Sequence, residues 1–456
     1  MELRDKKILV VGLGKTGWAT ARHLKNIGGR VKVTESRTSP ELQEKSEWLR
    51  QEGIEVEIGQ HSEEFSQDCD LVIPCPGVPP ESLPLKIARA SGKPVWSEIE
   101  VAYRLSPTRK ILAVTGTNGK TTTTALLGSL LNKAGWSAVV CGNIGNPFIG
   151  ELERLSEATW VVLEVSSFQL EYIHQFTPEV GILLNITPDH LDRYANLEEY
   201  ARVKFRLFSR QTKSQWAILN QDDPFCCRLA EQIDSRTIFF GFTPRRDNFW
   251  YEAGSIWTGF SEARKEVCRV EGVKLIGTGN LQNMMAVAAV SVVLKIGRRV
   301  VEETLRDFQP LPHRMEEVAE INGVRFVNDS KSTNADSVRK ALEAFPRKSV
   351  VLIMGGKDKG FSFSELRPIV GEKTKALILL GETARKIAQE LEKSGIPMVF
   401  APTLEEAVKL GYQEASRGET ILLSPGCSSF DMFTDYKERG DVFKKTVQTL
   451  LQAVRG

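Results

Sequence analysis

The sequence has no apolar run long enough to cross a membrane, no low-complexity segment and few cysteines. Because a membrane-spanning helix needs about 18 or more consecutive apolar residues, none is expected. The seven Cys residues are scattered without a CxxC pair, which excludes a disulfide-stapled miniprotein. Adjacent Cys226 and Cys227 suit neither zinc spacing nor an ordinary disulfide. We therefore expect free thiols in a reducing cytoplasm.

An excess of either charge is also missing. Sixty Lys and Arg residues stand against 58 Asp and Glu residues, which leaves a net charge of +2. No basic field points to nucleic acid, and no acidic tail is present. The N-terminal apolar run at 8–11 is too short for a signal peptide and is followed by glycines.

What the sequence does have is the composition of a globular protein, with 41% hydrophobic and 26% charged residues. A length of 456 residues predicts about three domains. Short β-branched runs alternate with helical patterns, which is typical of parallel α/β sheets. Strands are expected at 7–11, 31–34, 54–58, 69–73, 94–96, 111–115, 160–165, 180–186, 216–220, 324–328, 349–354, 375–380, 396–400 and 420–423.

Residues 237–275 break this alternation. Their aromatic and β-branched runs have no helical period and predict a small antiparallel insert, before a helix at 280–296. A stiff Pro-Leu-Pro linker follows at 310–312. We therefore predict an α/β chain with a Rossmann-like domain at 1–100, a central P-loop domain with the insert at 101–310, and a second Rossmann-like domain at 311–456.

A glycine-rich turn follows the first expected strand and opens a helix. Gly12-Leu-Gly14-Lys-Thr-Gly17 matches GxGxxG, and Glu35 ends the next strand 18 residues after Gly17. Glycines let the backbone approach a diphosphate, and the N-terminus of the helix favours its negative charge. The motif alone is compatible with NAD, with a nucleotide-sugar diphosphate or with a purely structural tight turn.

A second glycine-rich turn, Gly116-Thr-Asn-Gly119-Lys120-Thr121, joins the expected strand 111–115 to a helix. In a P-loop, backbone N–H groups surround phosphate oxygens, a lysine neutralises their charge and a hydroxyl binds Mg²⁺. The full Walker spacing requires glycine where the sequence has Val114. The alternative is a glycine turn whose threonine caps the helix, which the strand–turn–helix context disfavours.

Three charged residues accompany this motif. Glu164 ends an apolar strand, where it is either a solvated charge or, beside a P-loop, a Mg²⁺ ligand. His190 follows the next strand between two aspartates and is either a core histidine or a functional group. Lys204 lies in a helical pattern, where the residues alone favour a surface lysine.

Six segments occur in a fixed order along the chain, namely GTNGKT at 116–121, LEVSSFQLE at 163–171, NITPDHLDRY at 185–194, GNLQN at 279–283, LPHRME at 311–316 and VNDSKSTN at 327–334. Together they resemble the Mur ligase superfamily, whose members are ATP-dependent amide-forming enzymes of peptidoglycan precursor synthesis. More discriminating segments are GLGKTG at 12–17, CPGV at 75–78, GNIGNP at 142–147, GGKDKG at 355–360 and LSPGCSSFDMFTDYKERG at 423–440. The resemblance covers essentially the whole chain.

The resemblance implies a reaction. A carboxylate of UDP-N-acetylmuramoyl-L-alanine would attack the γ-phosphate of ATP, and the amine of D-glutamate would attack the resulting acyl phosphate through a tetrahedral intermediate. The implied cofactors are ATP, two Mg²⁺ ions and a carbamoylated Lys204, since a carbamate is an anionic metal ligand whereas Lys⁺ would repel the metal. We expect a cytoplasmic monomer with small-molecule substrates and with neither nucleic-acid nor membrane partners.

The resemblance also implies roles for individual residues. The implied catalytic residues are Lys120, His190, Lys204 and Lys359, and the metal ligands are Thr121, Glu164, His190 and Lys204. ATP would contact Gly116, Thr117, Asn118, Gly119, Lys120, Thr121, Thr122, Asn280, Asn283, Arg314, Asp329 and Lys331, with His313 orienting Arg314. The UDP-sugar would contact Gly14, Lys15, Thr16, Glu35, Ser36, Arg37, Gly77, Asn143, Ser166 and Gln169. D-glutamate would contact Lys331, Thr333, Lys359, Ser429 and Phe430.

Rival functions explain less of the sequence. An NAD-dependent oxidoreductase that rests on the first glycine turn leaves the P-loop, Glu164 and the third domain without a role. A P-loop regulator without chemistry does not account for GGKDKG or SPGCSSFD. A sister ligase with another amino-acid acceptor is the nearest alternative. In one detail the chain departs from the pattern, because Glu35-Ser36-Arg37 stands where related enzymes often have Asp-Thr-Arg.

Overall fold

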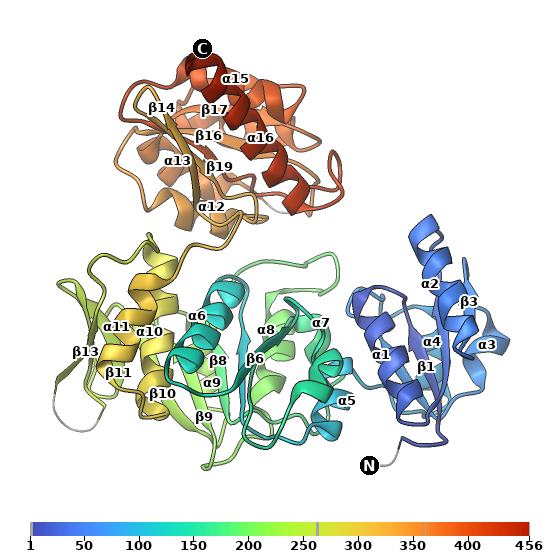
Figure 1. Cartoon of the computed structure of the whole chain (residues 1–456). Coiled ribbons are helices and arrows are strands. Elements are labelled where there is room, and N and C mark those ends of the chain that lie inside the picture. The colour runs from blue at the N-terminus through green and yellow to red at the C-terminus, as the bar shows by residue number, and fades with distance from the viewer. Residues whose placement is uncertain (1–2, 261–263, 361, 456) are drawn as a thin grey trace. The chain divides into compact units, whose positions relative to one another are not determined.

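The computed structural model describes residues 3–260, 264–360 and 362–455 and contains three sheets with helices packed against them (Figure 1). These sheets confirm the predicted α/β fold class with three domains. Contacts between residues divide the chain into two compact units. The first unit comprises Met1–Ile186, Glu198–Arg269 and Met285–Thr304, and the second comprises Thr187–Leu197, Val270–Met284 and Leu305–Gly456. The domain boundaries at 100 and 310 stay a prediction.

The N-terminal sheet has four parallel strands in the order β3–β2–β1–β4. Its elements are β1 (Lys7–Val11), α1 (Lys15–Asn26), β2 (Arg30–Glu35), α2 (Pro40–Gln51), β3 (Glu55–Ile58), α3 (Glu63–Gln67), β4 (Leu71–Pro74), α4 (Leu83–Ala90) and α5 (Glu98–Leu105). Because β1 is central, its C-terminal end delivers the first glycine turn to the edge where α/β proteins bind ligands. The strand predicted at 94–96 shrinks to one bridge between Val72 and Val95, since Ser97 already caps α5.

The central sheet has nine strands in the order β13–β12–β11–β10–β9–β8–β5–β7–β6. Its strands are β5 (Ile111–Thr115), β6 (Ala138–Gly142), β7 (Trp160–Glu164), β8 (Val180–Leu183), β9 (Trp216–Asn220), β10 (Arg236–Gly241), β11 (Asn248–Glu252), β12 (Ser255–Thr258) and β13 (Lys265–Arg269). The helices nearest to it in sequence are α6 (Lys120–Lys133), α7 (Ser167–Leu170), α8 (Leu197–Phe205), α9 (Pro224–Ala230), α10 (Thr278–Val293) and α11 (Arg298–Asp307), with 3₁₀ turns at Phe148–Arg154 (η1) and Arg206–Phe208 (η2).

The predicted antiparallel insert is confirmed for β11, β12 and β13, which pair antiparallel with one another in sequence order. β10 also falls in the predicted insert, yet it pairs parallel with both β9 and β11. The insert thus extends the central sheet, because β10 pairs with β9 on one side and with β11 on the other. Residues 261–263 of the predicted insert lie outside the described residues.

The third sheet has the order β14–β15–β19–β16–β17–β18, with only β14 antiparallel to its neighbour. Its elements are β14 (Glu316–Ile321), β15 (Val324–Asn328), α12 (Ala335–Leu342), β16 (Val350–Gly355), η3 (Ser364–Leu366), α13 (Arg367–Lys373), β17 (Thr374–Leu380), α14 (Ala384–Leu391), η4 (Glu392–Ser394), β18 (Met398–Phe400), α15 (Leu404–Glu414), β19 (Thr420–Leu423) and α16 (Tyr436–Arg455).

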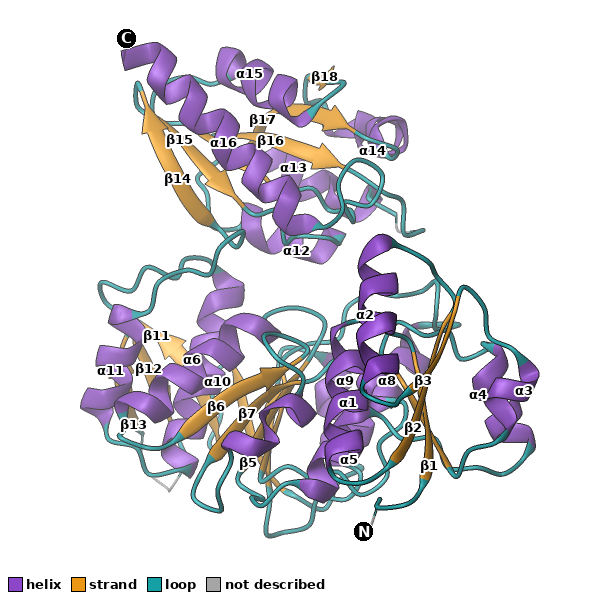
Figure 2. Cartoon of the chain, turned by 45° about the vertical axis from the view of Figure 1, so that its right-hand side comes forward, coloured by secondary structure: helices purple, strands orange, loops and turns teal. Residues whose placement is uncertain are grey.

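Alternate residues of β16 enter two separate cores in this third sheet. Leu352 packs with α12, α13 and α14, whereas Val351 and Ile353 pack with α15 and α16. This two-sided burial is what the alternation of side chains along a strand dictates when helices cover both faces. Helices α15 and α16 pack side by side on one face, as Figure 2 shows.

All seven cysteines are free thiols, as predicted. In the described part of the chain, no helix combines the length and apolar character that crossing a membrane requires.

Candidate active site

The first glycine turn is shaped by close packing. Gly12 has a φ of 97°, which favours glycine, and a Cβ on Gly17 would lie 2.0 Å from the carbonyl oxygen of Gly12. By contrast, Gly14 and Gly77 have no atom within 4 Å of their Cβ positions. Gly12 and Gly17 therefore let α1 approach β1, whereas Gly14 and Gly77 leave open space where the sequence predicts a UDP-sugar.

Glu35 fastens this turn to β2. Its Oε2 accepts a hydrogen bond from Leu13 N (2.9 Å), and its Oε1 accepts from Arg37 N (3.0 Å) and Arg37 Nε (3.1 Å). Burial alone would raise the pKa of Glu35, but these bonds outweigh it and lower the pKa. Ser36 and Arg37 are exposed, and Lys15 Nζ donates to Gly145 O at 2.6 Å. Three residues predicted for the UDP-sugar, Lys15, Glu35 and Arg37, are thus hydrogen-bonded within the protein itself.

The second glycine turn has the geometry of a phosphate-binding loop. Gly116 and Gly119 have φ values of 146° and 86°, which non-glycine residues rarely adopt, and α6 begins at Lys120. Lys120 Nζ folds over the turn and donates to Gly116 O (2.8 Å) and Thr117 O (2.7 Å). Backbone amides at a helix N-terminus together with an overlying ammonium group form an anion site.

Glu164 lies beside this turn, because β7 pairs with β5 and places it opposite Val114. Its Oε1 accepts a hydrogen bond from Asn143 Nδ2 (2.8 Å), while its Oε2 is buried without a hydrogen-bond partner. An unsatisfied buried carboxylate oxygen next to a phosphate site fits a hard cation such as Mg²⁺. The described residues contain no cluster of three His, Cys, Asp or Glu side chains that could hold a metal alone. Phosphate, hydroxyl or water ligands would have to complete the set, as Mg²⁺ prefers.

Lys204 is not a surface lysine. Its side chain is 1% exposed, its Nζ donates to Gly116 O at 3.0 Å, and the same atom lies 4.5 Å from the ring centroid of Tyr200. The interpretation from the residues alone is therefore wrong, because packing of α8 against the loop buries a position that its sequence leaves ambiguous. The structure brings Lys120 and Lys204 to one carbonyl oxygen.

Two residues predicted for the UDP-sugar path have a clear local role. Ser166 and Gln169 form the capping box of α7, in which each side chain bonds the backbone N–H of the other. Thr122, predicted for ATP, is 5% exposed in the first turn of α6.

In the second unit, the segment after β8 carries His190 in a left-handed conformation with a φ of 55°. The backbone N–H of His190 donates to Asp189 Oδ1 (3.0 Å), and the same oxygen lies 3.5 Å from Lys359 Nζ. Asn334 Nδ2 approaches the other oxygen of Asp189 at 3.5 Å. The structure thus joins His190 and Lys359, which are both predicted to be catalytic, through Asp189.

Asp329 ties the segment that precedes β14 to the end of β15. Its Oδ1 accepts from Met315 N (3.1 Å), and its Oδ2 accepts from the hydroxyls of Ser332 and Ser424. Burial raises the pKa of Asp329 to about 6, although these bonds and the Arg314 charge oppose the shift. Asp329 therefore holds the backbone next to Arg314.

His313 anchors the other side of Arg314. His313 and Met315 have φ values of 63° and 45°, so strained residues flank the arginine. The His313 ring is buried, its Nδ1 lies 3.1 Å from Asn328 Nδ2, and a Cβ on Gly440 would lie 2.1 Å from that Nδ1. This packing is consistent with the predicted orienting role.

The loops after β15, β16 and β19 meet at Arg439, which the sequence reasoning missed. Its guanidinium donates to Ser330 Oγ (3.0 Å), Ser330 O (2.8 Å), Cys427 O (3.1 Å) and Ser428 O (3.3 Å). A Cβ on Gly356 would lie 2.3 Å from Ser428 O, so the loop after β16 also approaches closely. Burial lowers the pKa of Arg439 to about 10, and the group is still a cation at neutral pH.

These three loops carry the residues predicted for D-glutamate. Lys331 Nζ lies 3.8 Å from the ring centroid of Tyr436, a second residue that the sequence reasoning missed. Ser429 is buried, while the side chain of Phe430 is 71% exposed. Both missed residues lie inside the quoted segment 423–440, so position within a matched segment was their only available indication.

Asn280 and Asn283 lie one turn apart at the start of α10. Asn283 Nδ2 donates to Asn280 Oδ1 (3.2 Å), and Asn280 Nδ2 donates to Ile276 O (2.8 Å). The two amides thus form one polar group on that helix, and their contact with ATP stays a prediction.

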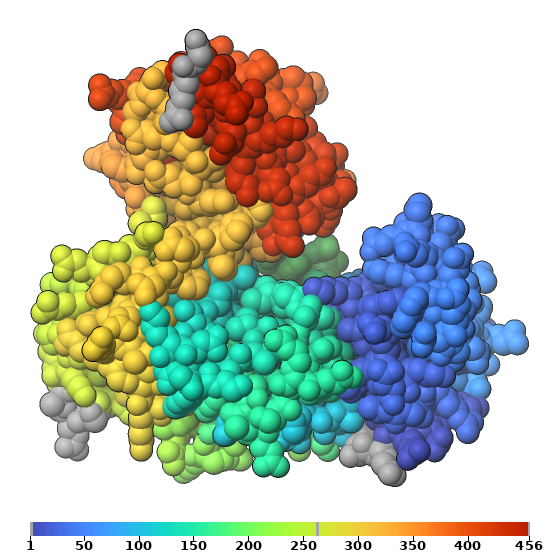
Figure 3. Space-filling view, in the orientation of Figure 1, coloured from blue at the N-terminus to red at the C-terminus, as the bar shows by residue number. Residues whose placement is uncertain are grey.

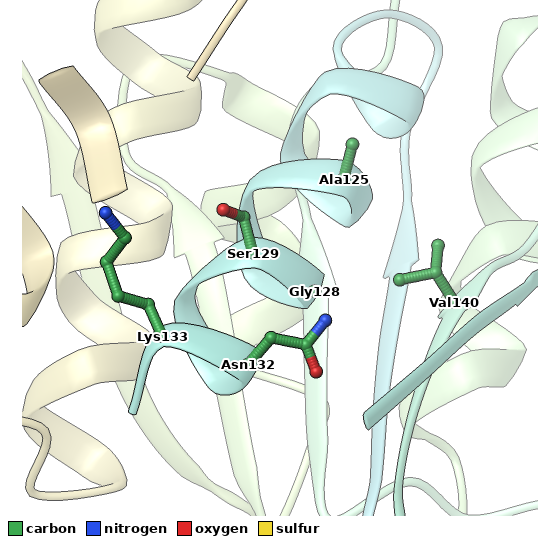
Figure 4. Close-up of a pocket in the computed structure, with 6 residues that line it drawn as sticks. All are labelled: Ala125, Gly128, Ser129, Asn132, Lys133 and Val140. Atoms are coloured by element: carbon green, nitrogen blue, oxygen red, sulfur yellow. The ribbon is translucent and has the colours of Figure 1, made fainter. Parts of the chain in front are cut away.

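A separate cavity of about 610 Å³ lies between α6 and the edge strand β6. It is lined by Ala125, Gly128, Ser129, Asn132, Lys133 and Val140, as Figure 4 shows. The turquoise segment that contains α6 and β6 reaches the surface in Figure 3. None of the predicted site residues lines this cavity, so it is distinct from the loop that begins α6.

Family models match three successive parts of the chain. A Mur ligase MurD-like N-terminal domain matches residues 6–97, a Mur ligase middle domain matches 114–291, and a Mur ligase glutamate ligase domain matches 313–427. Two UDP-N-acetylmuramoylalanine–D-glutamate ligases are similar over their whole length. The one from Koribacter versatilis is 40% identical and the one from Caldicellulosiruptor bescii is 41% identical, each over 99% of both chains.

Solved structures show the same fold at lower identity. UDP-N-acetylmuramate-alanine ligase MurC from Thermotoga maritima is 22% identical with a TM-score of 0.61, over 98% of this chain and 100% of that one. MurF ligase from Thermotoga maritima, solved in complex with ADP, is 18% identical with a TM-score of 0.60, over 98% of this chain and 96% of that one. The chain therefore belongs to the Mur ligase family, within its UDP-N-acetylmuramoylalanine–D-glutamate ligase branch.

Proposed function

We propose that this chain uses ATP to add D-glutamate to UDP-N-acetylmuramoyl-L-alanine, a step of peptidoglycan precursor synthesis, as a cytoplasmic monomer. The observation that carries the proposal is the identity of 40–41% to D-glutamate ligases across 99% of both chains. The oxidoreductase alternative has no comparable support, because the relatives match the P-loop and the third domain together with the first glycine turn.

The P-loop and its neighbours are assigned to phosphoryl transfer. Lys120 would stabilise the charge of the β- and γ-phosphates while the substrate carboxylate attacks, in keeping with its place over the loop. Thr121, Glu164, His190 and a carbamoylated Lys204 would hold Mg²⁺, and the buried unsatisfied oxygen of Glu164 supports this assignment. When bound, Mg²⁺ supplies charge neutralisation on the phosphates. Asn280, Asn283, Arg314 and Asp329 would contact the rest of ATP.

The acceptor is assigned to the loops that Arg439 joins. Lys331, Thr333, Lys359, Ser429 and Phe430 would contact D-glutamate, and two ammonium groups with two hydroxyls suit a dicarboxylate. The UDP-sugar is assigned to the first glycine turn, where Gly14 and Gly77 leave open space. We further propose the domains 1–100 for the UDP-sugar, 101–310 for ATP and 311–456 for the amino acid.

Purified protein with ATP, Mg²⁺ and UDP-N-acetylmuramoyl-L-alanine tests this function by phosphate release. We expect phosphate release with D-glutamate and none with L-alanine or lysine. Release with L-alanine on the unsubstituted UDP-muramic acid would instead identify a sister ligase. NADH consumption would favour an oxidoreductase. Size-exclusion chromatography with light scattering tests the monomer.

A further inference from the structure

The phosphate-binding loop is held from outside by Asn185, a residue to which the proposed mechanism gives no role. Asn185 lies two residues after the end of β8, the neighbour of β5 in the central sheet. Its side chain is only 7% exposed, so its amide must be satisfied within the protein.

The oxygen and the nitrogen of this side-chain amide both form hydrogen bonds with one residue of the loop. Asn185 Oδ1 accepts from Asn118 N (2.8 Å), and Asn185 Nδ2 donates to Asn118 O (3.1 Å). The backbone oxygen of Asn185 also accepts from Thr117 N (2.9 Å). Three hydrogen bonds therefore fix the orientation of the two residues that separate Gly116 from Gly119.

The backbone around Asn185 is itself fixed on both sides. Leu184 O accepts a hydrogen bond from Asn220 Nδ2 (2.9 Å), and Ile186 N donates to Asp223 Oδ2 (2.7 Å). Asp223 is in turn the N-cap of α9, where its Oδ1 accepts from Phe225 N (2.9 Å). The support of the loop thus reaches from the start of α9 through Asn185 to Asn118.

We propose that Asn185 is a positioning residue of the ATP site, which presets the loop 116–119 in its phosphate-binding conformation. The inference rests on the proposed ATP-dependent function. Glycine adopts many backbone conformations at little cost, so a loop bounded by Gly116 and Gly119 needs an external constraint to hold one of them. A preset loop avoids the entropy cost of ordering when the phosphates bind.

The backbone amides of the loop differ in their partners. Thr117 N and Asn118 N both donate to Asn185, so these two amides hold the loop. Thr123 N donates to Gly119 O (3.0 Å), which starts the helical pattern of α6. Amides of a first helical turn that precede such bonds are the ones that bind anions at helix N-termini.

Two substitutions separate positioning from packing. Asn185→Ala removes both side-chain hydrogen bonds to Asn118 and keeps the backbone bond from Thr117 N, whereas Asn185→Asp keeps the shape and the acceptor but replaces the Nδ2 donor with an anionic oxygen facing Asn118 O. Asn248→Ala is the matched control, since Asn248 is also buried and bonds to Arg245 N, Gln221 Oε1 and Thr243 O. All three variants lose a buried hydrogen-bonded amide, but only the first two touch the ATP loop.

The measurements are the Kd of Mg·ADP by calorimetry and the KM values for ATP and D-glutamate. Both Asn185 variants should weaken ADP binding and raise the KM for ATP on the order of tenfold, as expected for the loss of one or two hydrogen bonds. The KM for D-glutamate and all constants of Asn248→Ala should stay within about threefold. Thermal unfolding should show comparable stability losses for Asn185→Ala and Asn248→Ala.

Three results would overturn the inference. ADP affinity in both Asn185 variants equal to that of the wild type would show that the side-chain hydrogen bonds of Asn185 do not affect nucleotide binding. Wild-type affinity in Asn185→Asp alone would show that the paired hydrogen bonds of the amide do not position the loop, since this variant keeps only one of them. A wild-type protein that binds no ADP would remove the proposed ATP-dependent function itself, which distinguishes that failure from the other two.

Discussion

Lys120 and Lys204 donate to the same carbonyl oxygen, that of Gly116, at 2.8 and 3.0 Å. One lysine starts α6 and the other lies near the end of α8, so two helices direct their ammonium groups to one point of the loop. Two ammonium groups that share one acceptor repel each other, and the carbamoylation proposed for Lys204 would replace that repulsion with an anionic group beside Lys120. This carbonyl oxygen therefore marks the point where the proposed phosphate-binding cation and the proposed metal ligand come together.

The first prediction concerns Lys120. Lys120→Ala should lower turnover by more than ~10²-fold, because the charge that grows on the phosphates loses its nearest cation. Phosphate release at saturating substrates measures this loss, and circular dichroism should show an unchanged fold. Lys133→Ala, at the exposed far end of the same helix, is the control and should keep normal turnover. Unchanged turnover in Lys120→Ala would remove the residue from the mechanism.

The second prediction concerns Arg439. Arg439→Lys should raise the KM for D-glutamate about tenfold, since an ammonium cannot reproduce four hydrogen bonds to three residues. The KM for ATP should change less, because Cys427 and Ser428 lie in a loop assigned to the amino acid alone, although Ser330 lies between Asp329 and Lys331, which are assigned to ATP. Lys445→Met removes an exposed cation from the same helix and is the matched control. Equal changes in both KM values would indicate general unfolding of the domain instead.

The third prediction concerns the pH dependence of stability at Glu98. Its Oε1 accepts from Ile149 N (2.6 Å), its Oε2 is buried without a partner, and burial raises its pKa from 4.5 to about 7. A raised pKa means that the unfolded chain ionises first, so stability is full below pH 4.5 and falls as pH rises towards 7. Compared with Glu98→Gln, the wild type should lose roughly 3 kcal/mol in its free energy of unfolding as pH rises.

Urea unfolding of wild type and Glu98→Gln at pH 5 and pH 8 measures this difference. The free energy of unfolding of Glu98→Gln should increase relative to that of the wild type as pH rises from 5 to 8. The free energy of unfolding of Glu64→Gln, which changes an exposed residue, should equal that of the wild type at both pH values. A gap between wild type and Glu98→Gln that does not depend on pH would contradict the prediction.

The strands and turns that the sequence predicts are those with a strong local cause. β5 is a continuous apolar run, and the positive φ values of Gly116 and Gly119 can be anticipated because few other residues adopt them. β6 and β14 are absent from the predicted strands. β6 is a short apolar run that periodicity cannot separate from a buried helix, and β14 contains three glutamates that weaken its β pattern.

The residues of the site likewise divide into those with a local sequence pattern and those without one. The P-loop residues are contiguous, so the sequence alone indicates their chemistry. The burial of Lys204 depends on how α8 packs, and the roles of Asn185 and Arg439 depend on hydrogen bonds to residues 67 and 109 positions away. Such contacts have no local pattern, since an asparagine after a strand or an arginine in a helix is commonplace. Only the three-dimensional structure distinguishes these two from other polar residues.

The last prediction concerns Gly440, which lies against the His313 ring. A Cβ at this position would lie 2.1 Å from His313 Nδ1, so Gly440→Ala must push the ring away or shift α16. Overpacking of this kind costs about 1–3 kcal/mol, and it should also raise the KM for ATP, because His313 precedes Arg314. Gly297→Ala is the control, since no atom lies within 4 Å of its Cβ position. Thermal unfolding and ATP kinetics measure both effects, and a Gly440→Ala variant as stable and as active as Gly297→Ala would show that the ring is free to move.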